Sequence, residues 1–294
     1  MSQPVTTPPV AVGSVQSRDG TPISYRHVGE GPGLVVLHGT MSSAENHVEL
    51  AMALADAYTV YIPDRRGRGE SGPFPAAYGV QTEVEDLDAV LEATGATDVL
   101  GVSSGAIIGL EAAAGGSRIR RLAAFEPPLF DNPETPRALL TRFDAEMARG
   151  RLAVALVVAM KGAKMGPPIF NLFPDGLLVS MTTLAMRQED RRPRNGYVPM
   201  RSLAPLLHYD LQLVAEANTA EAGFARIDQR VLLLGGSKSP GYLRAALDRL
   251  QGMLPNAERV ELAGLDHSAT WNTDLRGNPG SVADALRRFF VKAG

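Results

Sequence analysis

The sequence Asp98-Val-Leu-Gly-Val-Ser-Ser-Gly-Ala-Ile-Ile-Gly109 places Gly101-Val-Ser103-Ser-Gly105 between an apolar run and a run of small residues. The apolar run is typical of a buried strand, and the small residues suit a helix packed closely on a sheet. G-x-S-x-G at such a junction predicts a nucleophile elbow, a strained strand-to-helix turn that needs glycine where backbone meets backbone. The alternative is a Gly/Ser-rich loop without chemistry, and the flanking patterns favour the elbow.

Strand-like runs alternate with helical patterns along much of the chain. The runs cover residues 34–37, 59–62, 99–102, 122–125, 231–234 and 260–262. Alternation of this kind predicts an α/β fold with a mostly parallel central sheet and helices on both faces. Ahead of the first run, residues 12–27 hold Asp19-Gly20 between strand-like segments, which indicates a hairpin.

The alternation stops between Glu126 and Gln229, where only helical patterns occur. We therefore predict an inserted helical cap at residues 129–217, a core formed by residues 12–128 and 218–294, and a disordered arm at residues 1–11. Two interpretations of the apolar helical stripes in the cap stay open, because they could pack only on one another or also line a pocket. For the second case we expect substrate contacts from the following residues: Met41, Phe143, Phe170, Phe173 and Met181.

Composition excludes several classes of protein. The formal net charge is −3 over 294 residues, with no basic run, so nucleic acid is not an expected partner. The chain has no cysteine, which removes disulfides, thiol catalysis and thiolate metal sites. No apolar run is long enough to span a membrane, and the first residues lack the pattern of a signal peptide, so a cytoplasmic location is expected.

A serine nucleophile needs a base, and that base works best when a carboxylate orients it. The chain has five histidines. His267 directly follows the last strand-like run, where a loop would present it to Ser103, so His267 is the expected base. His47 is expected on a helix surface, whereas nothing in the sequence requires His208 to face a pocket.

Four segments in the same order resemble the α/β-hydrolase fold enzymes that carry a cap. They are Val35-Val-Leu-His38-Gly39-Thr40, Pro63-Asp-Arg-Arg-Gly-Arg-Gly-Glu-Ser71, the elbow, and the loop that bears His267. The resemblance implies that the backbone N–H groups of Thr40 and Ser104 form an oxyanion hole. It also implies that His38 is structural, and that the arginine- and glycine-rich segment is a turn.

The acid is where the chain departs from the commonest pattern of these enzymes. Many relatives carry an aspartate in a turn after the strand that corresponds to residues 231–234, but this turn has Ser239 at that position. Some members place the acid one strand earlier, where this chain has Glu126 before Pro127 and Pro128. We therefore predict Glu126 as the acid. In the alternative, Glu126 caps a loop and the orienting residue is Asp266 or is missing.

The leading hypothesis is a serine hydrolase with Ser103, His267 and Glu126 as catalytic residues. It would cleave an ester, lactone or thioester of a small, largely apolar substrate through an acyl-enzyme on Ser103. One alternative is a lyase, isomerase or cyclase on the same fold that uses His267 as acid and base. Another is a ligand-binding module without catalysis. No cofactor, metal or membrane partner is expected, and a homodimer stays open.

Overall fold

The fold is built on one eight-stranded sheet. A computed structural model of the protein describes residues 9–165 and 172–291. Its strands are β1 (Ala11–Gln16), β2 (Pro22–Val28), β3 (Gly33–Leu37), β4 (Thr59–Pro63), β5 (Asp98–Val102), β6 (Arg121–Phe125), β7 (Arg230–Gly236) and β8 (Ala257–Leu262). The spatial order is β1-β2-β4-β3-β5-β6-β7-β8. Pairing is antiparallel for β1 with β2 and for β2 with β4, and parallel from β4 onward, which confirms the predicted fold class.

The predicted hairpin is formed by β1 and β2, joined through the turn at Gly20, where φ is +83°. Ala11 already lies in β1, so the sheet begins inside the segment predicted to be a disordered arm; residues 1–8 lie outside the described part of the chain. Arg66 anchors the hairpin to the core through Asp19 and Asp86.

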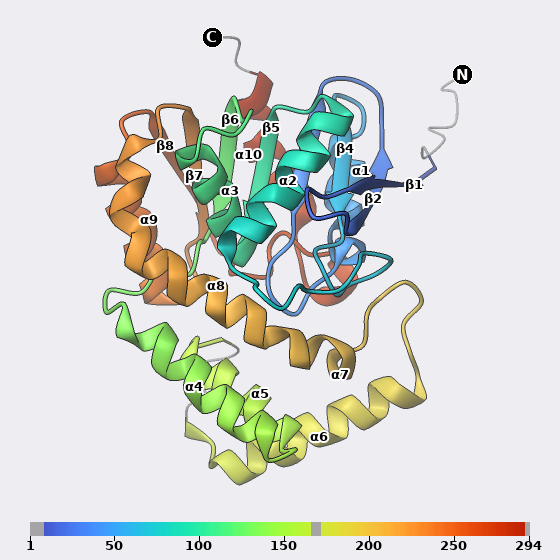
Figure 1. Cartoon of the computed structure of the whole chain (residues 1–294), viewed down its shortest axis with the longest axis vertical. Coiled ribbons are helices and arrows are strands. Elements are labelled where there is room, and N and C mark those ends of the chain that lie inside the picture. The colour runs from blue at the N-terminus through green and yellow to red at the C-terminus, as the bar shows by residue number, and fades with distance from the viewer. Residues whose placement is uncertain (1–8, 166–171, 292–294) are drawn as a thin grey trace.

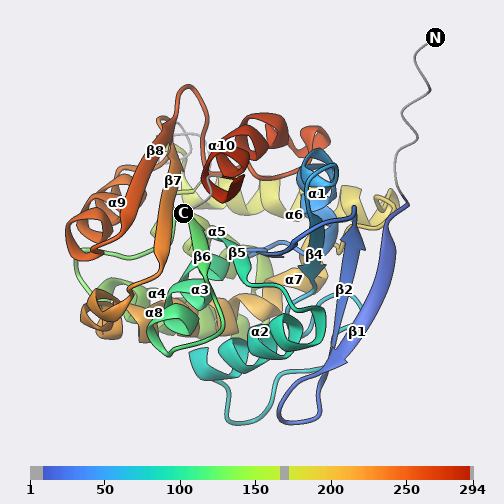
Figure 2. The same cartoon turned by 90° about the horizontal axis from the view of Figure 1, so that it is seen from above.

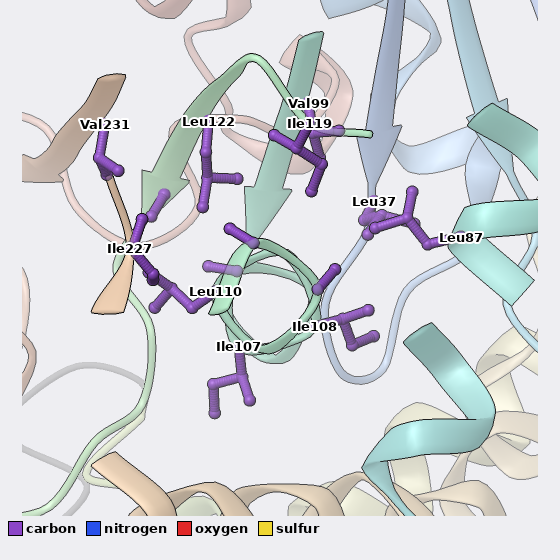
Figure 3. Packing of buried hydrophobic residues seen from close by; sticks show 14 of the residues in the cluster. Leu37, Leu87, Val99, Ile107, Ile108, Leu110, Ile119, Leu122, Ile227 and Val231 are labelled. Atoms are coloured by element: carbon purple, nitrogen blue, oxygen red, sulfur yellow. The ribbon is translucent and has the colours of Figure 1, made fainter. Parts of the chain in front are cut away.

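Helices cover both faces of the sheet (Figures 1 and 2). One face carries α2 (Val80–Thr94), α3 (Ser104–Ala114) and α9 (Gly241–Met253), and the other carries α1 (Val48–Leu54) and α10 (Pro279–Val291). Successive side chains of β5 point to opposite faces of the sheet. Val99 packs with α2, α3 and α9, and Leu100 packs with α1 and α10. Figure 3 shows α3 beside the strands that hold Val99 and Leu122, with Ile107 on the side of the helix that faces away from these strands.

The region without strands is helical, as predicted. It contains α4 (Glu134–Ala148), α5 (Leu152–Gly162), α6 (Asp175–Arg191), α7 (Met200–Leu203) and α8 (Leu207–Ala220). In Figure 1, α8 runs between the sheet-containing core and the helices α4, α5 and α6. The predicted boundary between residues 217 and 218 falls inside α8, which packs against both α3 and α4. Thus α8 joins the cap to the core.

The cap has an apolar core of its own, which includes Leu139, Phe143, Leu156 and Met186. Its stripes therefore pack on one another, and the cavity described below shows that some of the same helices also line a pocket. Within the described residues, no helix combines the length and apolar character needed to cross a membrane.

Candidate functional site

Ser103 lies at a sharp turn between β5 and α3. Its backbone has φ 55° and ψ −121°, a left-handed conformation that is unusual for a residue other than glycine. The turn is held because the Ser103 N–H donates to the carbonyl of Phe125 at 2.8 Å. Strained residues held by their surroundings occur often at functional sites, so the turn makes Ser103 a candidate for a role in chemistry.

Two glycines make this turn sterically feasible. A Cβ at Gly105 would lie 2.4 Å from the carbonyl oxygen of Leu37, and a Cβ at Gly39 would lie 2.8 Å from the Cβ of Ser103. These separations are below ordinary van der Waals contact, so both positions require glycine. The sequence pattern thus reflects close approach of β3, β5 and α3.

His267 and Glu126 are joined by a short hydrogen bond. The ring Nδ1 of His267 lies 2.6 Å from Oε2 of Glu126. Because a carboxylate only accepts, Nδ1 carries the proton, which leaves Nε2 of the neutral ring unprotonated. Oε1 of Glu126 accepts from the Gly236 N–H at 2.6 Å, so both carboxylate oxygens have donors. Glu126 is fully buried, with φ 49°, directly after β6.

The two other positions considered for the acid lie elsewhere. Asp266 accepts from the N–H and the hydroxyl of Ser268 through Oδ1, at 2.9 and 2.7 Å. Ser239 is buried, and its hydroxyl has no hydrogen-bond partner in the described structure. Among the described residues, only the carboxylate of Glu126 contacts the His267 ring through a hydrogen bond.

Thr40 and Ser104 both lie next to Ser103, Ser104 in the sequence and Thr40 through packing of the neighbouring Gly39. Thr40 follows Gly39, which packs against Ser103, and Ser104 begins α3. Within the described residues, neither backbone N–H has a hydrogen-bond acceptor. Their side chains are linked, because the two hydroxyl oxygens lie 3.2 Å apart. Two free N–H groups beside a serine at a helix N-terminus can bind a developing negative charge.

A cavity of about 280 Å³ is lined by Thr40, Ser103 and His267 and extends beneath the cap. Its polar lining residues include Thr40, Ser103, Asp210 and His267. The apolar lining consists of Met41, Val102, Pro128, Phe130, Pro136, Leu139, Leu156, Ala159, Met160, Ala163, Met165, Leu207, Leu211 and Val214, with Gly39, Tyr242 and Trp271 completing the wall. Ser103 and His267 thus share one cavity, although no hydrogen bond joins them; such bonds are often long without a ligand.

The expected substrate contacts are only partly brought to this cavity. Met41 lines it, with φ 53°. Phe143 is instead fully buried in the core of the cap, and Met181 is 43% exposed on α6. Phe173 is half-buried and does not line the cavity, while Phe170 lies outside the described residues. The apolar stripes that suggested Phe143 and Met181 could not distinguish the face toward the cavity from the faces toward the cap core and solvent.

Sequence reasoning missed several lining residues, of which Asp210 is the most informative. Asp210 lies on α8 between Leu207 and Leu211, which also line the cavity. A carboxylate on an otherwise apolar helical stripe is the signal that could have identified it.

Tyr242 and Phe130, which also line the cavity, stack with their ring centroids 4.5 Å apart, and burial raises the pKa of the Tyr242 hydroxyl.

The remaining histidines have structural surroundings. His38 is fully buried, donates from Nδ1 to the Gly39 carbonyl at 2.9 Å, and accepts from the Arg65 N–H at 3.1 Å. Burial holds the pKa of His38 well below its usual range. The surface position expected for His47 is wrong: this residue is fully buried and donates from Nδ1 to the Thr270 carbonyl at 3.0 Å.

His208 lies on the cap, 2.9 Å from Asp144, and does not line the cavity. Among the described residues, no group of three or more His, Cys, Asp or Glu side chains could hold a metal ion.

A family model described as the alpha/beta hydrolase family matches residues 34–285, which include the elbow and the loop of His267. The chain belongs to the alpha/beta hydrolase family. An alpha/beta hydrolase from Sphaerobacter thermophilus is 34% identical, with a TM-score of 0.76 over 95% of this chain and 100% of that one. E-2-(acetamidomethylene)succinate hydrolase is 20% identical, with a TM-score of 0.63 over 96% of this chain and 99% of that one, a likeness of fold alone.

Among curated proteins, the chain is similar to cis-3-alkyl-4-alkyloxetan-2-one decarboxylase from Shewanella oneidensis. The two are 28% identical over 165 residues, which cover 51% of this chain and 52% of the decarboxylase. The uncharacterized hydrolase YraK from Bacillus subtilis is 35% identical over 96 residues, which cover 31% of this chain and 35% of YraK. The matches therefore span about half or less of these relatives.

Proposed function

We propose that this alpha/beta hydrolase is a serine hydrolase that cleaves an ester, lactone or thioester through an acyl-enzyme on Ser103. The observation that carries the proposal is the hydrogen bond between His267 and Glu126 at the cavity that also contains Ser103. An oriented neutral histidine beside a strained serine is the arrangement that converts a hydroxyl into a nucleophile.

In the first half of the reaction, Ser103 Oγ attacks the carbonyl carbon and its proton moves to Nε2 of His267. Glu126 stabilises the resulting imidazolium through its hydrogen bond to Nδ1. The carbonyl oxygen becomes negatively charged and accepts from the N–H groups of Thr40 and Ser104. Collapse of this intermediate breaks the bond to the leaving group, which takes the proton from His267 and leaves an acyl group on Ser103.

In the second half, water attacks the acyl carbon while His267 takes a proton from it. The same N–H groups donate to the second oxyanion. When the intermediate collapses, Ser103 Oγ leaves and takes the proton from His267. The carboxylic acid product is then free and the side chains have returned to their starting protonation states.

The cavity supports a small, largely apolar substrate. Its volume of about 280 Å³ is at the lower end of ligand pockets, and its walls are mostly apolar apart from the reacting end. The decarboxylase relative is named for a dialkyl oxetan-2-one, a four-membered lactone with two apolar substituents. We therefore include alkyl-substituted lactones with aryl esters and acyl thioesters as substrate classes to be tested.

A panel of these three substrate classes tests the proposal. The wild-type protein should hydrolyse at least one class, and Ser103→Ala and His267→Ala should each lower kcat on the order of 10³-fold or more. Thermal melting of each variant would establish that it is folded. Equal turnover by wild type and Ser103→Ala would overturn the proposal.

A second candidate is a lyase reaction on the same fold, with His267 as acid and base. The name of the decarboxylase relative favours it, because a lactone substrate can lose carbon dioxide rather than gain water. This candidate predicts release of carbon dioxide and an alkene from the lactone, with activity retained in Ser103→Ala. Formation of a hydroxy acid would instead support hydrolysis. A ligand-binding module without catalysis would give neither product.

A further inference from the structure

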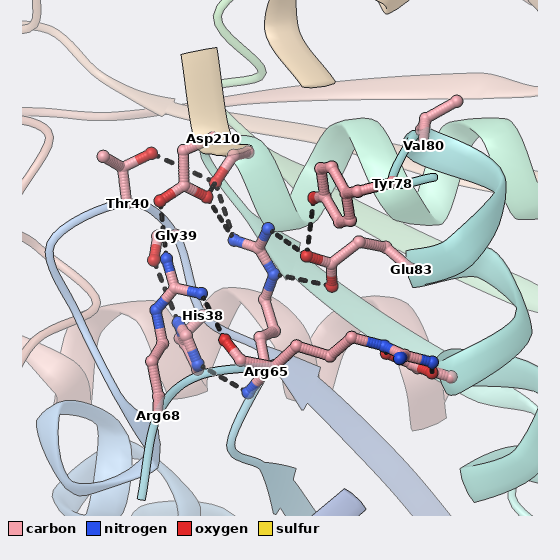
Figure 4. A network of polar contacts seen from close by, with 12 residues as sticks. His38, Gly39, Thr40, Arg65, Arg68, Tyr78, Val80, Glu83 and Asp210 are labelled. Atoms are coloured by element: carbon pink, nitrogen blue, oxygen red, sulfur yellow. Dashed lines mark hydrogen bonds and ion pairs between the residues drawn. The ribbon is translucent and has the colours of Figure 1, made fainter. Parts of the chain in front are cut away.

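The side chains of the two residues of the proposed oxyanion hole, Thr40 and Ser104, belong to a buried polar cluster, part of which Figure 4 shows. Asp210, from α8, accepts from Arg65 Nη1 at 2.8 Å and from Arg68 Nη2 at 2.5 Å. The hydroxyl of Ser104 lies 3.4 Å from the same carboxylate, 3.2 Å from the hydroxyl of Thr40 and 3.0 Å from Arg65 Nη1. The side chains of the two proposed donor residues are thus linked to each other and to the cap.

The hydrogen-bonding capacity of each group indicates which group donates and which accepts in this cluster. The Asp210 carboxylate and the Ser104 hydroxyl each accept from Arg65, so Ser104 has one proton left to donate. A charged carboxylate is a stronger acceptor than a hydroxyl, which favours donation from Ser104 to Asp210 and from Thr40 to Ser104. Both hydroxyl contacts are longer than the usual 2.7 Å or so, leaving room to shorten when a ligand binds.

Charge balance explains why a carboxylate is tolerable beside a forming oxyanion. Asp210 and Glu83 are paired with Arg65 and Arg68, and the four side chains are each no more than 2% exposed. Two positive and two negative charges sum to zero, so the cluster does not repel negative charge as an isolated Asp210 would. Burial away from water disfavours the charged form of Arg65. The carboxylates of Glu83 and Asp210 outweigh this effect and hold the pKa of the Arg65 guanidinium well above its usual range.

We infer that Asp210, acting through the hydroxyls of Ser104 and Thr40, positions the two backbone N–H groups that stabilise the oxyanion. The inference rests on the proposed function. Asp210 is a positioning residue in this account, because the N–H groups alone contact the reacting oxygen. Since Asp210 comes from α8, the helix that joins cap and core supplies part of the support for the oxyanion hole.

The hydroxyl link is tested with Thr40→Val, Ser104→Ala and the double variant, all of which retain both backbone N–H groups. We expect each single variant to lower kcat by about 10-fold or more with KM within about 2-fold, because a misplaced donor weakens binding of the transition state. The double variant should lose no more than the worse single variant, because both remove the same link. Thr40→Ser, which restores the hydroxyl, should recover most of the kcat.

Affinity for an alkyl trifluoromethyl ketone, a mimic of the tetrahedral intermediate, should fall in parallel with kcat. A merely structural role for these hydroxyls would instead lower melting temperature without this parallel loss. Wild-type kcat in the Thr40→Val and Ser104→Ala variants, or additive losses in the double variant, would overturn the inference. Failure of the proposed function is distinct, because the wild type itself would then hydrolyse no ester and bind no ketone covalently.

The part played by Asp210 is tested with Asp210→Asn, which preserves size but removes the charge. The same selective loss of kcat is expected, and unchanged kcat would remove Asp210 from the account. If this variant does not fold, the charge-balanced double variant Asp210→Asn with Arg68→Gln takes its place, because it removes one charge of each sign. That double variant should also lose kcat selectively, and wild-type kcat in it would equally contradict the role of Asp210.

Discussion

The Nδ1 atom of His267 lies 2.6 Å from Oε2 of Glu126, a carboxylate that follows β6 rather than the neighbouring strand β7. Gly235 and Gly236 at the end of β7 make room for it: a Cβ at Gly235 would lie 2.9 Å from Oε1 of Glu126, and Gly236 donates its N–H to the same oxygen. Glu126, directly after β6, can therefore reach the loop after β8, because the intervening strand β7 ends in two glycines that have no side chain to block the contact.

Glu126→Gln should lower kcat by about 10³- to 10⁴-fold, because an amide neither fixes the required histidine tautomer nor stabilises the imidazolium. Asp266→Asn is the matched control, since Asp266 bonds to Ser268 and not to the ring, and its kcat should stay within about 2-fold of wild type. Steady-state kinetics on one ester checks both variants. A large loss in Asp266→Asn with wild-type kcat in Glu126→Gln would contradict the assignment and favour Asp266 as the acid.

Acid should destabilise the protein through His47. Burial lowers the pKa of His47 from 6.5 to about 4 in the folded protein. Between these pH values the unfolded chain binds a proton that the folded chain does not, so the free energy of unfolding falls as pH drops from about 6.5 to about 4. The loss attributable to His47 is about 3 kcal/mol, and none occurs above that window. Burial lowers the pKa of His38 as well, which adds in the same direction.

Urea unfolding at pH 7 and pH 5 measures this effect in wild type and in His47→Gln. The variant should be less stable at pH 7, because it loses hydrogen bonds, but its stability should change less between the two pH values. An identical pH dependence in the two proteins would show that His47 does not contribute.

Ala159→Phe should shift substrate preference toward short chains. Ala159 lines the cavity from α5, so a larger side chain there would occupy space needed by a long apolar substituent. We expect kcat/KM for a p-nitrophenyl octanoate to fall at least about 10-fold relative to the acetate, a difference of about 1.4 kcal/mol. Leu184→Ser on the outer side of α6, where Leu184 is 66% exposed, should leave the ratio unchanged. A constant ratio in Ala159→Phe would place the acyl chain elsewhere.

Arg66→Met should destabilise the fold by about 3–5 kcal/mol, because it leaves buried carboxylate charge without its partner. Arg66 is fully buried, and its guanidinium donates to both oxygens of Asp86 at 2.7 Å and to Asp19 at 2.8 Å. Arg18→Ala removes a pair with Glu85 in which Arg18 is 81% exposed, so less than about 1 kcal/mol should be lost. Urea midpoints of the two variants provide the comparison, and similar losses would contradict it.

The fold could be predicted from local patterns, because buried parallel strands and the helices between them differ in apolar periodicity. The elbow could be predicted in the same way, because close backbone contacts require glycine at Gly105 and Gly39, and these glycines are visible in the sequence. Glu126 could be proposed by its place after a strand, but its contact with His267 depends on how β6, β7 and the last loop lie together.

The cavity wall could not be predicted in the same way. An apolar side chain such as Phe143 gives the same helical signal whether it faces another helix or a ligand, and only the packing of the cap separates the two. His47 was misplaced for a related reason, because its burial comes from the distant Thr270 loop rather than from its own helix. Asp210 calls for a different kind of inference: a charged residue on an apolar helical stripe indicates that it has a buried partner.

The most direct test of the central claim is covalent labelling of the protein with an alkyl fluorophosphonate, followed by intact-mass and peptide mass spectrometry. We expect one adduct per chain, located on Ser103, with labelling abolished in Ser103→Ala and strongly slowed in His267→Ala. Absence of an adduct on the folded wild-type protein, or an adduct on a residue other than Ser103, would contradict the assignment of Ser103 as the nucleophile.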